Sequence, residues 1–344
     1  MKGPSKDSWH PVMASDTTTS SYWLNWRVLL CSIWVWISMV FALFLIWKYE
    51  GFRKRSPGET QQQEEAGALY EDETWRPCLK GIHPAWLLAF RVFAFFVLLV
   101  LLIVTTLTDG GGGLFYFYTQ WTFTLITIYF GLGSLLSMYG CYQYHKKAGG
   151  DRVGNVEGDA EQGTGGATTH GENSKMSDPS KSSGPHEQHN LRKPAGIWGY
   201  VFQIIFQMNA GAVMLTDCVF WFIIVPFLTM KDYNLNFLII NMHTINAVFL
   251  LGDTALNSLR FPWFRIGYFS LWTVVYVVFQ WIVHASVKLW WPYPFLDLSS
   301  SYAPLWYLSV AVMHIPCYGI FALIMKLKHF VLSTKYPQSY QCMT

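Results

Sequence analysis

The sequence predicts an all-α membrane protein, a polytopic bundle of about seven transmembrane helices. Only 13% of its 344 residues are charged, against roughly 25% in a soluble domain, and 18% are aromatic. Residues 48–84 and 144–195 hold 27 of the 45 charges, so the rest of the chain consists mostly of long apolar blocks. A net charge of +3 cannot form a strongly basic face, which excludes a nucleic-acid partner as well as an ordinary soluble enzyme.

Seven blocks are long enough to cross roughly 30 Å of hydrocarbon as helices, at about 1.5 Å per residue. We expect the spans at residues 28–47, 85–107, 115–142, 211–230, 235–259, 266–287 and 302–325. Residues 196–209 have apolar side chains at near-helical spacing and are predicted to form an interfacial helix that leads into the fourth span. Membrane lipid is therefore the expected surrounding of most of the chain.

Loop charges predict the orientation. Lys and Arg gather in residues 48–84 and 144–195, after the fifth span and in the tail, whereas the alternate loops between spans carry at most one each. The positive-inside rule then places the N-terminus outside and the C-terminus in the cytoplasm. Residues 149–189 are rich in Gly, Ser and Thr and cannot bury enough apolar surface to order. The predicted segments are an extracytoplasmic tail 1–27, a helix 28–47, a cytoplasmic loop 48–84, helices 85–143, a disordered cytoplasmic loop 144–195, the interfacial helix and last four spans 196–325, and a cytoplasmic tail 326–344.

The cysteines give no metal-binding pattern. None of the six forms a C-x-x-C spacing and none lies in a predicted outside loop, so free thiols, no metal and no cofactor are expected. Cys78, Cys141 and Cys342 lie near the predicted cytoplasmic surface, where palmitoylation is an alternative.

Charged residues inside the spans need a partner or a route to the headgroups. Arg91 lies about two turns from the end of its span, so we expect its stem to snorkel to the headgroups. Asp217 lies near the middle of its span and is either protonated or paired, with His314 as one possible partner. A structural pair and a functional site are both compatible with Asp217. Asp253, with Arg260 at i+7, is interpreted as structural.

Polar residues concentrate in the fifth span. Asn236, His243, Asn246 and Asp253 follow one another at spacings that place them on one helical stripe, which we expect to face the bundle interior. A buried His can be a purely structural residue, but one within a polar stripe in lipid is also a candidate functional group.

A layer in the outer third of the bundle can hold Thr119, Gln120, His243 and His284. Asn241 and Asp217 are the other candidates for this polar pocket. A Thr hydroxyl beside an imidazole can act as a nucleophile with its general base. The alternative is that the Thr hydroxyl only bonds its own i−4 carbonyl, as is common in membrane helices.

Several stretches resemble one superfamily in order and placement. Residues 117–130, FYTQWTFTLITIYF, resemble the Thr-bearing helix of the androgen-induced-protein family of membrane hydrolases, and residues 241–244, NMHT, resemble its His-bearing motif. Residues 219–221, VFW, and 291–297, WPYPFLD, match in the same order. The rolling-stone family of multispan proteins is the closer relative by resemblance. The resemblance covers residues 85–325, which leaves the first span and both charged loops outside it.

The resemblance implies a hydrolase of fatty-acid esters of hydroxy fatty acids. Thr119 would be the nucleophile and His243 its base, with His284 in a supporting role and no metal or organic cofactor. The rolling-stone resemblance implies instead a non-catalytic membrane scaffold or interaction protein. A receptor or transporter is a third reading, but residues 139–142, YGCY, replace the receptor signature at the end of span three, and the prolines give no matched pair of broken helices. The plasma membrane and the endoplasmic reticulum both fit the sequence.

Overall fold

The structure is a computed structural model that describes residues 16–50, 67–108, 111–160, 193–226 and 237–342, and it is all-α. Its α-helices are α1 Ser20–Trp23, α2 Trp26–Glu50, α3 Pro84–Thr108, α4 Tyr118–Ala160, α5 Ile197–Val219, α7 Phe237–Met242, α8 Ile245–Leu256, α9 Ile266–Ser286 and α10 Ala303–Lys335. Short helical turns are η1 Glu71–Thr74, η2 Gly111–Tyr116, the π-helical η3 Phe220–Ile224, η4 Trp263–Arg265 and η5 Pro294–Leu296.

The predicted fold class is confirmed. Seven helices of the described chain are long and apolar enough to cross a membrane: Trp26–Glu50, Pro84–Thr108, Tyr118–Lys146, Ile197–Ile224, Leu238–Leu256, Trp263–Ser286 and Ala303–Lys335. The chain is therefore a multispan integral membrane protein. The loop 144–195 was predicted to be disordered, but residues 144–160 continue α4 as a helix, which contradicts the prediction there. Residues 161–192 of this loop, like Asn236, lie outside the described residues.

Three boundaries differ from the prediction. The interfacial helix expected at 196–209 is wrong, because α5 begins at Ile197 and buries Phe202, Gln203 and Phe206 within the bundle. The third span was expected to end at 142, but α4 continues as a helix to Ala160. The fifth span was expected as one helix, whereas α7 and α8 are separate.

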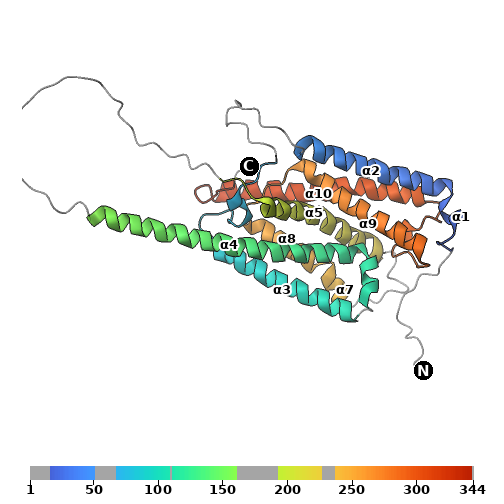
Figure 1. The fold of residues 1–344 in the computed structure, drawn as a ribbon, viewed down its shortest axis with the longest axis horizontal. Coiled ribbons are helices and arrows are strands. Elements are labelled where there is room, and N and C mark those ends of the chain that lie inside the picture. Colours follow the sequence, from blue (N-terminus) through green and yellow to red (C-terminus); the bar gives the residue numbers. More distant parts are fainter. Residues whose placement is uncertain (1–15, 51–66, 109–110, 161–192, 227–236, 343–344) are drawn as a thin grey trace, which may run out of the picture.

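Helix α5 occupies the centre of the bundle. It contacts α4, α8, α9 and α10, while α2 lies along one flank and α3 along the opposite one (Figure 1). One hydrophobic cluster includes Phe123, Phe206 and Phe249 around α4, α5 and α8, and a second includes Phe269 and Tyr318 on α9 and α10. Gly211 lets α5 and α9 approach closely, since a Cβ there would lie 2.3 Å from the Phe269 ring.

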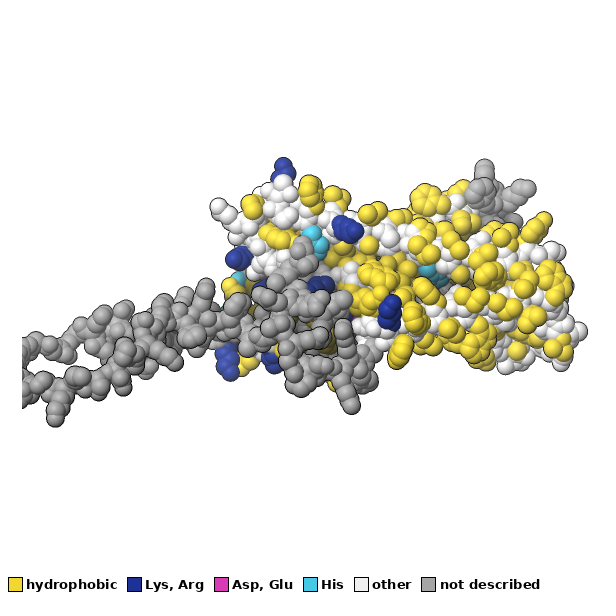
Figure 2. All heavy atoms as spheres, turned by 90° about the horizontal axis from the view of Figure 1, so that it is seen from above, with side chains coloured by type: hydrophobic (Ala, Val, Ile, Leu, Met, Phe, Trp, Pro, Cys, Tyr) yellow, Lys and Arg dark blue, Asp and Glu magenta, His cyan; other side chains and the backbone are white. Residues whose placement is uncertain are grey.

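Large apolar side chains cover the outside of the bundle. Figure 2 shows hydrophobic side chains over most of one face, with the visible Lys and Arg side chains toward one end. A continuous apolar surface of this size would drive association in water, but it matches the hydrocarbon of a bilayer. The exposed residues include Trp36, Phe41, Phe93, Phe96, Val312, Ile315, Leu323 and Phe330.

The bundle has two chemically different ends. At the basic end, ion pairs join the segments after α2, α4 and α8 to one another, and they are Glu50–Arg265, Glu71–Lys193 and Glu73–Arg260. It holds Lys48, Arg76, Lys80, Lys193, Arg260, Arg265, Lys326, Lys328 and Lys335. The aromatic end carries Phe117, Trp281, Trp290, Trp291, Tyr293 and Phe295, and among the described cations Arg27 and Lys288 lie there.

Tyr22, which lies before the first span, forms hydrogen bonds at the aromatic end. The Tyr22 hydroxyl donates to Asp297 Oδ1 at 2.9 Å and accepts from Trp291 Nε1 at 3.0 Å. Burial, together with the Asp297 carboxylate, raises the pKa of the Tyr22 phenol well above its usual value, so it remains a hydrogen-bond donor. The first span is thereby fastened to the segment between α9 and α10.

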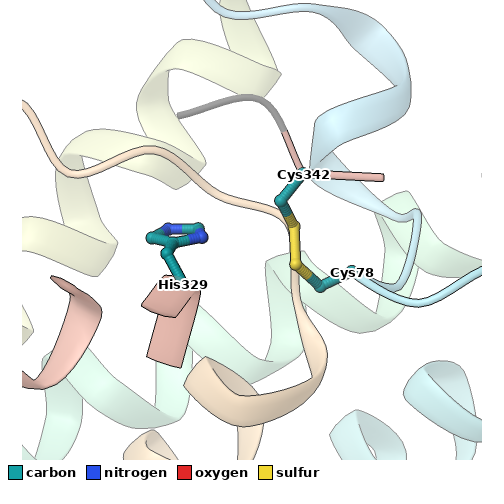
Figure 3. A group of neighbouring side chains, drawn as sticks. All are labelled: Cys78, His329 and Cys342. Atoms are coloured by element: carbon teal, nitrogen blue, oxygen red, sulfur yellow. A yellow bond between two sulfur atoms is a disulfide. The ribbon is translucent and has the colours of Figure 1, made fainter. Parts of the chain in front are cut away.

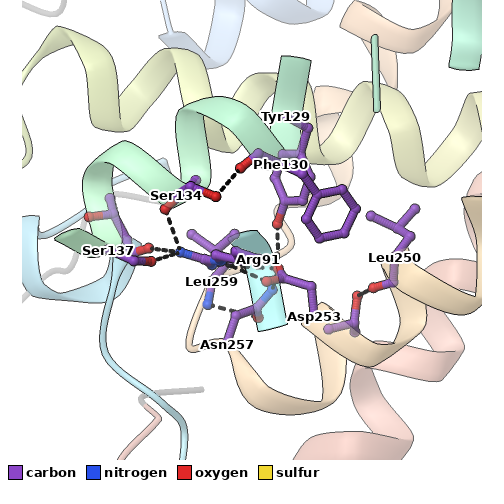
Figure 4. Close-up of polar contacts among 12 residues, drawn as sticks. Arg91, Tyr129, Phe130, Ser134, Ser137, Leu250, Asp253, Asn257 and Leu259 are labelled. Atoms are coloured by element: carbon purple, nitrogen blue, oxygen red, sulfur yellow. Dashed lines mark hydrogen bonds and ion pairs between the residues drawn. The ribbon is translucent and has the colours of Figure 1, made fainter. Parts of the chain in front are cut away.

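Arg91 does not snorkel. It is 0% exposed, and its Nε lies 2.7 Å from Asp253 Oδ1 (Figure 4). The expected route of Arg91 to the headgroups is therefore wrong, and so is Arg260 as the neighbour of Asp253. Asp253 pairs with Arg91 and not with Arg260, because Tyr129 and Asn257 also donate to it inside the bundle. The cost of a charge in lipid is met here by a partner on another helix and not by the headgroups.

The expectation of free thiols fails for one pair. Cys78 and Cys342 form a disulfide that joins the segment before α3 to the tail after α10, and both are buried, which also removes them as palmitoylation candidates. Cys31, Cys141, Cys218 and Cys317 are free, as expected.

Candidate functional site

The structure brings Asp217 of α5 next to His243, which lies between α7 and α8. The distance from His243 Nδ1 to Asp217 Oδ1 is 3.5 Å, and the imidazole stacks on the Phe220 ring at 3.7 Å between centroids. Sequence reasoning offered His314 as the partner of Asp217. That is wrong, because His314 bonds Thr273 and its own helix instead.

Both helices around this pair are irregular. Three residues after Asp217, the chain passes from α5 into the π-helical turn η3, and π-helical turns are frequent at functional sites. The helix break at His243 leaves its carbonyl outside the regular ladder, and the Trp221 indole N–H donates to it at 3.0 Å. The Ala247 N–H donates to the Asn246 side chain at 2.7 Å, which replaces the lost helical acceptor. The side chains of Trp221 and Asn246 therefore bond the backbone carbonyl and N–H groups that the helix break leaves without helical partners.

In this pair, Asp217 Oδ2 and His243 Nδ1 have no hydrogen-bond partner among the described residues. The same holds for both amide atoms of Gln120 on α4. Gln120 is 1% exposed, and Phe123, one turn along α4, packs in the same cluster as Met242. Native proteins satisfy most buried polar atoms, so these groups have unused capacity to bind a polar ligand. Asn241 lies in the last turn of α7, two residues before His243.

Thr119 faces a different part of the bundle. Its hydroxyl lies 3.4 Å from the Tyr293 hydroxyl, on the segment between α9 and α10. No hydrogen bond joins Thr119 to His243 in the part of the chain that the structure describes. The predicted catalytic pair therefore stays a prediction.

His284 has a structural environment. Its Nδ1 lies 2.7 Å from the Gln280 carbonyl, its Nε2 lies 3.3 Å from the Trp290 carbonyl, and the ring stacks on Trp291 at 3.7 Å. A carbonyl only accepts, so a neutral imidazole donates to only one of these two carbonyls, of which that of Gln280 is the nearer, and the ring packs on the aromatic segment through Trp291.

A hydrogen-bonded Thr–His pair occurs elsewhere, where sequence reasoning did not place it. Thr273 Oγ1 on α9 lies 2.8 Å from His314 Nε2 on α10, and 2.9 Å from the Tyr118 hydroxyl on α4. His314 Nδ1 lies 2.7 Å from the Val310 carbonyl. Because a carbonyl only accepts, Nδ1 carries the proton in the neutral ring, and Nε2 is left as an acceptor.

The proton of Thr273 has three possible acceptors. The Phe269 carbonyl lies 3.4 Å away, the Tyr118 hydroxyl oxygen 2.9 Å away and His314 Nε2 2.8 Å away, and the imidazole nitrogen is the nearest of the three. The resulting order of groups, a hydroxyl, an imidazole base and a carbonyl that orients the base, is the arrangement of an activated nucleophile.

This Thr–His pair lines a small open crevice between α2, α9, α10 and the η5 turn. Most of the lining is apolar, with Trp34, Val277 and Phe295 among it, and Ser38 and Ser270 add hydroxyls. A sequence signal existed, since Thr273 and His314 both interrupt apolar helices, but nothing in the sequence pairs them.

Comparison of the chain with family models, with curated proteins and with solved structures finds no match. The resemblance to the androgen-induced and rolling-stone families therefore stays a prediction.

Proposed function

We propose that this multispan membrane protein hydrolyses lipid esters, with a Thr hydroxyl as nucleophile and a His as its base. The observation that supports this proposal best is the 2.8 Å bond between Thr273 and His314 at the wall of an apolar crevice. Thr119 with His243 remains the competing assignment, supported by the resemblance and by Asp217 beside the imidazole.

The proposed reaction needs only these side chains and water. Thr273 Oγ bonds to the ester carbonyl carbon while its proton passes to His314 Nε2. The alcohol leaves with that proton, and the acyl group stays on Thr273. Water then attacks the acyl ester, with His314 as base, and restores the free hydroxyl. The Tyr118 hydroxyl is positioned to stabilise negative charge on Thr273 Oγ.

The substrate class follows from the position of the crevice. Three of its walls are membrane-spanning helices, so acyl chains reach it from the bilayer and charged metabolites do not. Its few hydroxyls suit an ester or a hydroxyl group on an apolar chain. Fatty-acid esters of hydroxy fatty acids, the class that the resemblance implies, meet both requirements.

Hydrolysis of such esters by the protein purified in detergent tests the proposal and separates the two assignments. Thr273→Val should abolish activity, Thr273→Ser should retain much of it, and His314→Gln should lower it by roughly 10²–10⁴-fold. A fluorophosphonate label should appear on the native protein and on Thr119→Ala but not on Thr273→Val. The opposite pattern, with loss in Thr119→Ala and His243→Ala only, assigns the reaction to the other pair.

The alternative function is a non-catalytic membrane scaffold or interaction protein. It is favoured by the same two interhelical hydrogen bonds, because Tyr118, Thr273 and His314 also fasten α4, α9 and α10 together. Equal activity, or none, in native protein and in all folded variants would refute the enzyme and leave this alternative.

We further propose that the N-terminus lies outside and the C-terminus in the cytoplasm. The gathering of Lys and Arg at one end of the bundle supports this orientation. A glycosylation acceptor placed within residues 149–189 should stay unmodified in microsomes, whereas one placed before residue 16 should be modified. The reverse result would overturn the orientation.

A further inference from the structure

The tail after α10 folds back along the segment before α3 at the basic end. The Gln341 N–H donates to the Cys78 carbonyl at 3.0 Å, and the Lys80 N–H donates to the Ser339 carbonyl at 2.7 Å. The backbone thus holds Cys78 and Cys342 with their Cα atoms 5.1 Å apart. Because backbone hydrogen bonds set this approach, the two sulfurs stay neighbours when the disulfide is reduced.

A histidine completes the group. The ligand atoms of Cys78, Cys342 and His329 all lie within 4.8 Å of one another, and Figure 3 shows the His329 ring beside the two sulfurs. His329 Nδ1 bonds the Tyr340 hydroxyl at 2.9 Å. When Nδ1 donates in this bond, the lone pair lies on Nε2, and an outer hydrogen bond of this kind is what orients metal-binding histidines.

We propose that the reduced chain binds one Zn²⁺ through Cys78, Cys342 and His329, with water or a further side chain as fourth ligand. Two thiolates and an imidazole are a ligand set that selects zinc, with Zn–S about 2.3 Å and Zn–N about 2.0–2.1 Å. Tetrahedral geometry then places the ligand atoms roughly 3.3–3.8 Å apart, which requires only a small opening of the sulfur pair.

Metal and disulfide exclude each other. A cellular dithiol supplies two electrons and two protons to the Cys78–Cys342 bond, giving two thiols and an oxidised donor. The thiols release their protons as they bind the metal. Oxidation reverses the sequence and expels the ion, so the tail is held by either a metal or a covalent bond.

The reduced form is the relevant one under the proposed orientation, because disulfides are rare in the cytosol. Cys78 and Cys342 are 1% and 5% exposed, so a bound ion would be shielded from competing ligands. This inference does not depend on the proposed hydrolysis, and the in-vitro test below does not depend on the orientation.

Co²⁺ titration of the full chain in detergent micelles tests the site. The protein is reduced with a phosphine, the phosphine is removed, and the free thiols are counted by alkylation and mass spectrometry. Native protein should show a thiolate-to-cobalt charge-transfer band and tetrahedral d–d bands, saturating at about one ion per chain. Zn²⁺ should displace the cobalt, and the oxidised protein should show neither band.

Variants assign the ligands. Cys342→Ser should lose the charge-transfer band, and His329→Gln should weaken binding by at least about tenfold. Cys141→Ser, which removes a free cysteine outside the group, should bind as the native chain does. Reduced native protein without the bands, or Cys342→Ser with unchanged bands and an unchanged elution volume, would overturn the proposal.

Discussion

Replacing Arg91 by Met tests whether the buried ion pair fastens the bundle. Met fills a similar volume without charge, so the change leaves the Asp253 carboxylate buried with Tyr129 and Asn257 as its remaining donors. Removing one partner of a buried pair costs about 3–5 kcal/mol. Because two donors remain on Asp253, we expect the lower limit, about 3 kcal/mol of the free energy of unfolding.

A substitution of Asp253 and the double variant show how much of the loss comes from the interaction between Arg91 and Asp253 itself. Asp253→Leu leaves the Arg91 guanidinium with neutral acceptors only, the Thr74 carbonyl at 2.7 Å and the Ser137 hydroxyl at 2.8 Å. We expect about 3–5 kcal/mol here as well. Arg91→Met with Asp253→Leu removes both charges together and should cost less than either single change, so the coupling energy is expected to be at least about 3 kcal/mol.

The free energy of unfolding can be measured by SDS titration in mixed micelles. Lys193→Met is the matched control, because Lys193 is 76% exposed in its ion pair with Glu71 and an exposed pair contributes little to stability. If Arg91→Met costs no more than this control, or if the double variant costs the sum of the singles, the bundle does not depend on this pair.

Three other predictions use the same protein. Gly211→Val should destabilise by at least about 1–3 kcal/mol, because its side chain meets the Phe269 ring, whereas Gly319→Ala, with open space at the Cβ, should be neutral or stabilising in the same titration. Trp221→Phe should speed hydrogen exchange in the first turn of α8, since the carbonyl at the helix break loses its donor; unchanged exchange would argue against this capping. Tyr22→Phe removes the bond to its carboxylate acceptor and should expose the segment before α2 to protease, while an unaltered cleavage pattern would mean that other contacts hold it.

The fold could be predicted from the sequence because the bilayer constrains it. A span needs about 20 apolar residues, so the seven blocks alone give the number and order of helices. The predicted boundaries were wrong where a segment is buried against other helices of the bundle and does not face lipid or the membrane interface. The apolar spacing of residues 196–209 suggested an interfacial helix, yet the amides of Gln203 and Gln207 in this stretch donate to the Arg260 carbonyl inside the bundle.

Partners of polar residues could not be predicted, because they depend on how the helices rotate against each other. The stripe of His243, Asn246 and Asp253 was correctly expected to face inward, since that follows from helical spacing alone. Its partners, Asp217 for His243 and Arg91 for Asp253, come from other helices, where spacing carries no information. For the same reason the bond between Thr273 and His314 was missed.

The polar groups of this membrane bundle divide by how completely they are satisfied. Around Arg91 and Asp253 every charge meets an opposite charge or several donors and acceptors, which is what a purely structural group requires. Asp217, His243 and Gln120 keep atoms that have no hydrogen-bond partner among the described residues. Such atoms weaken the fold, so their retention has to be explained by something other than stability. Thr273 lies between these cases, because its hydroxyl is bonded to His314, a base that can take its proton. The variants Thr273→Ser, which keeps the hydroxyl, and Thr273→Val, which removes it, therefore distinguish a catalytic role from a structural one.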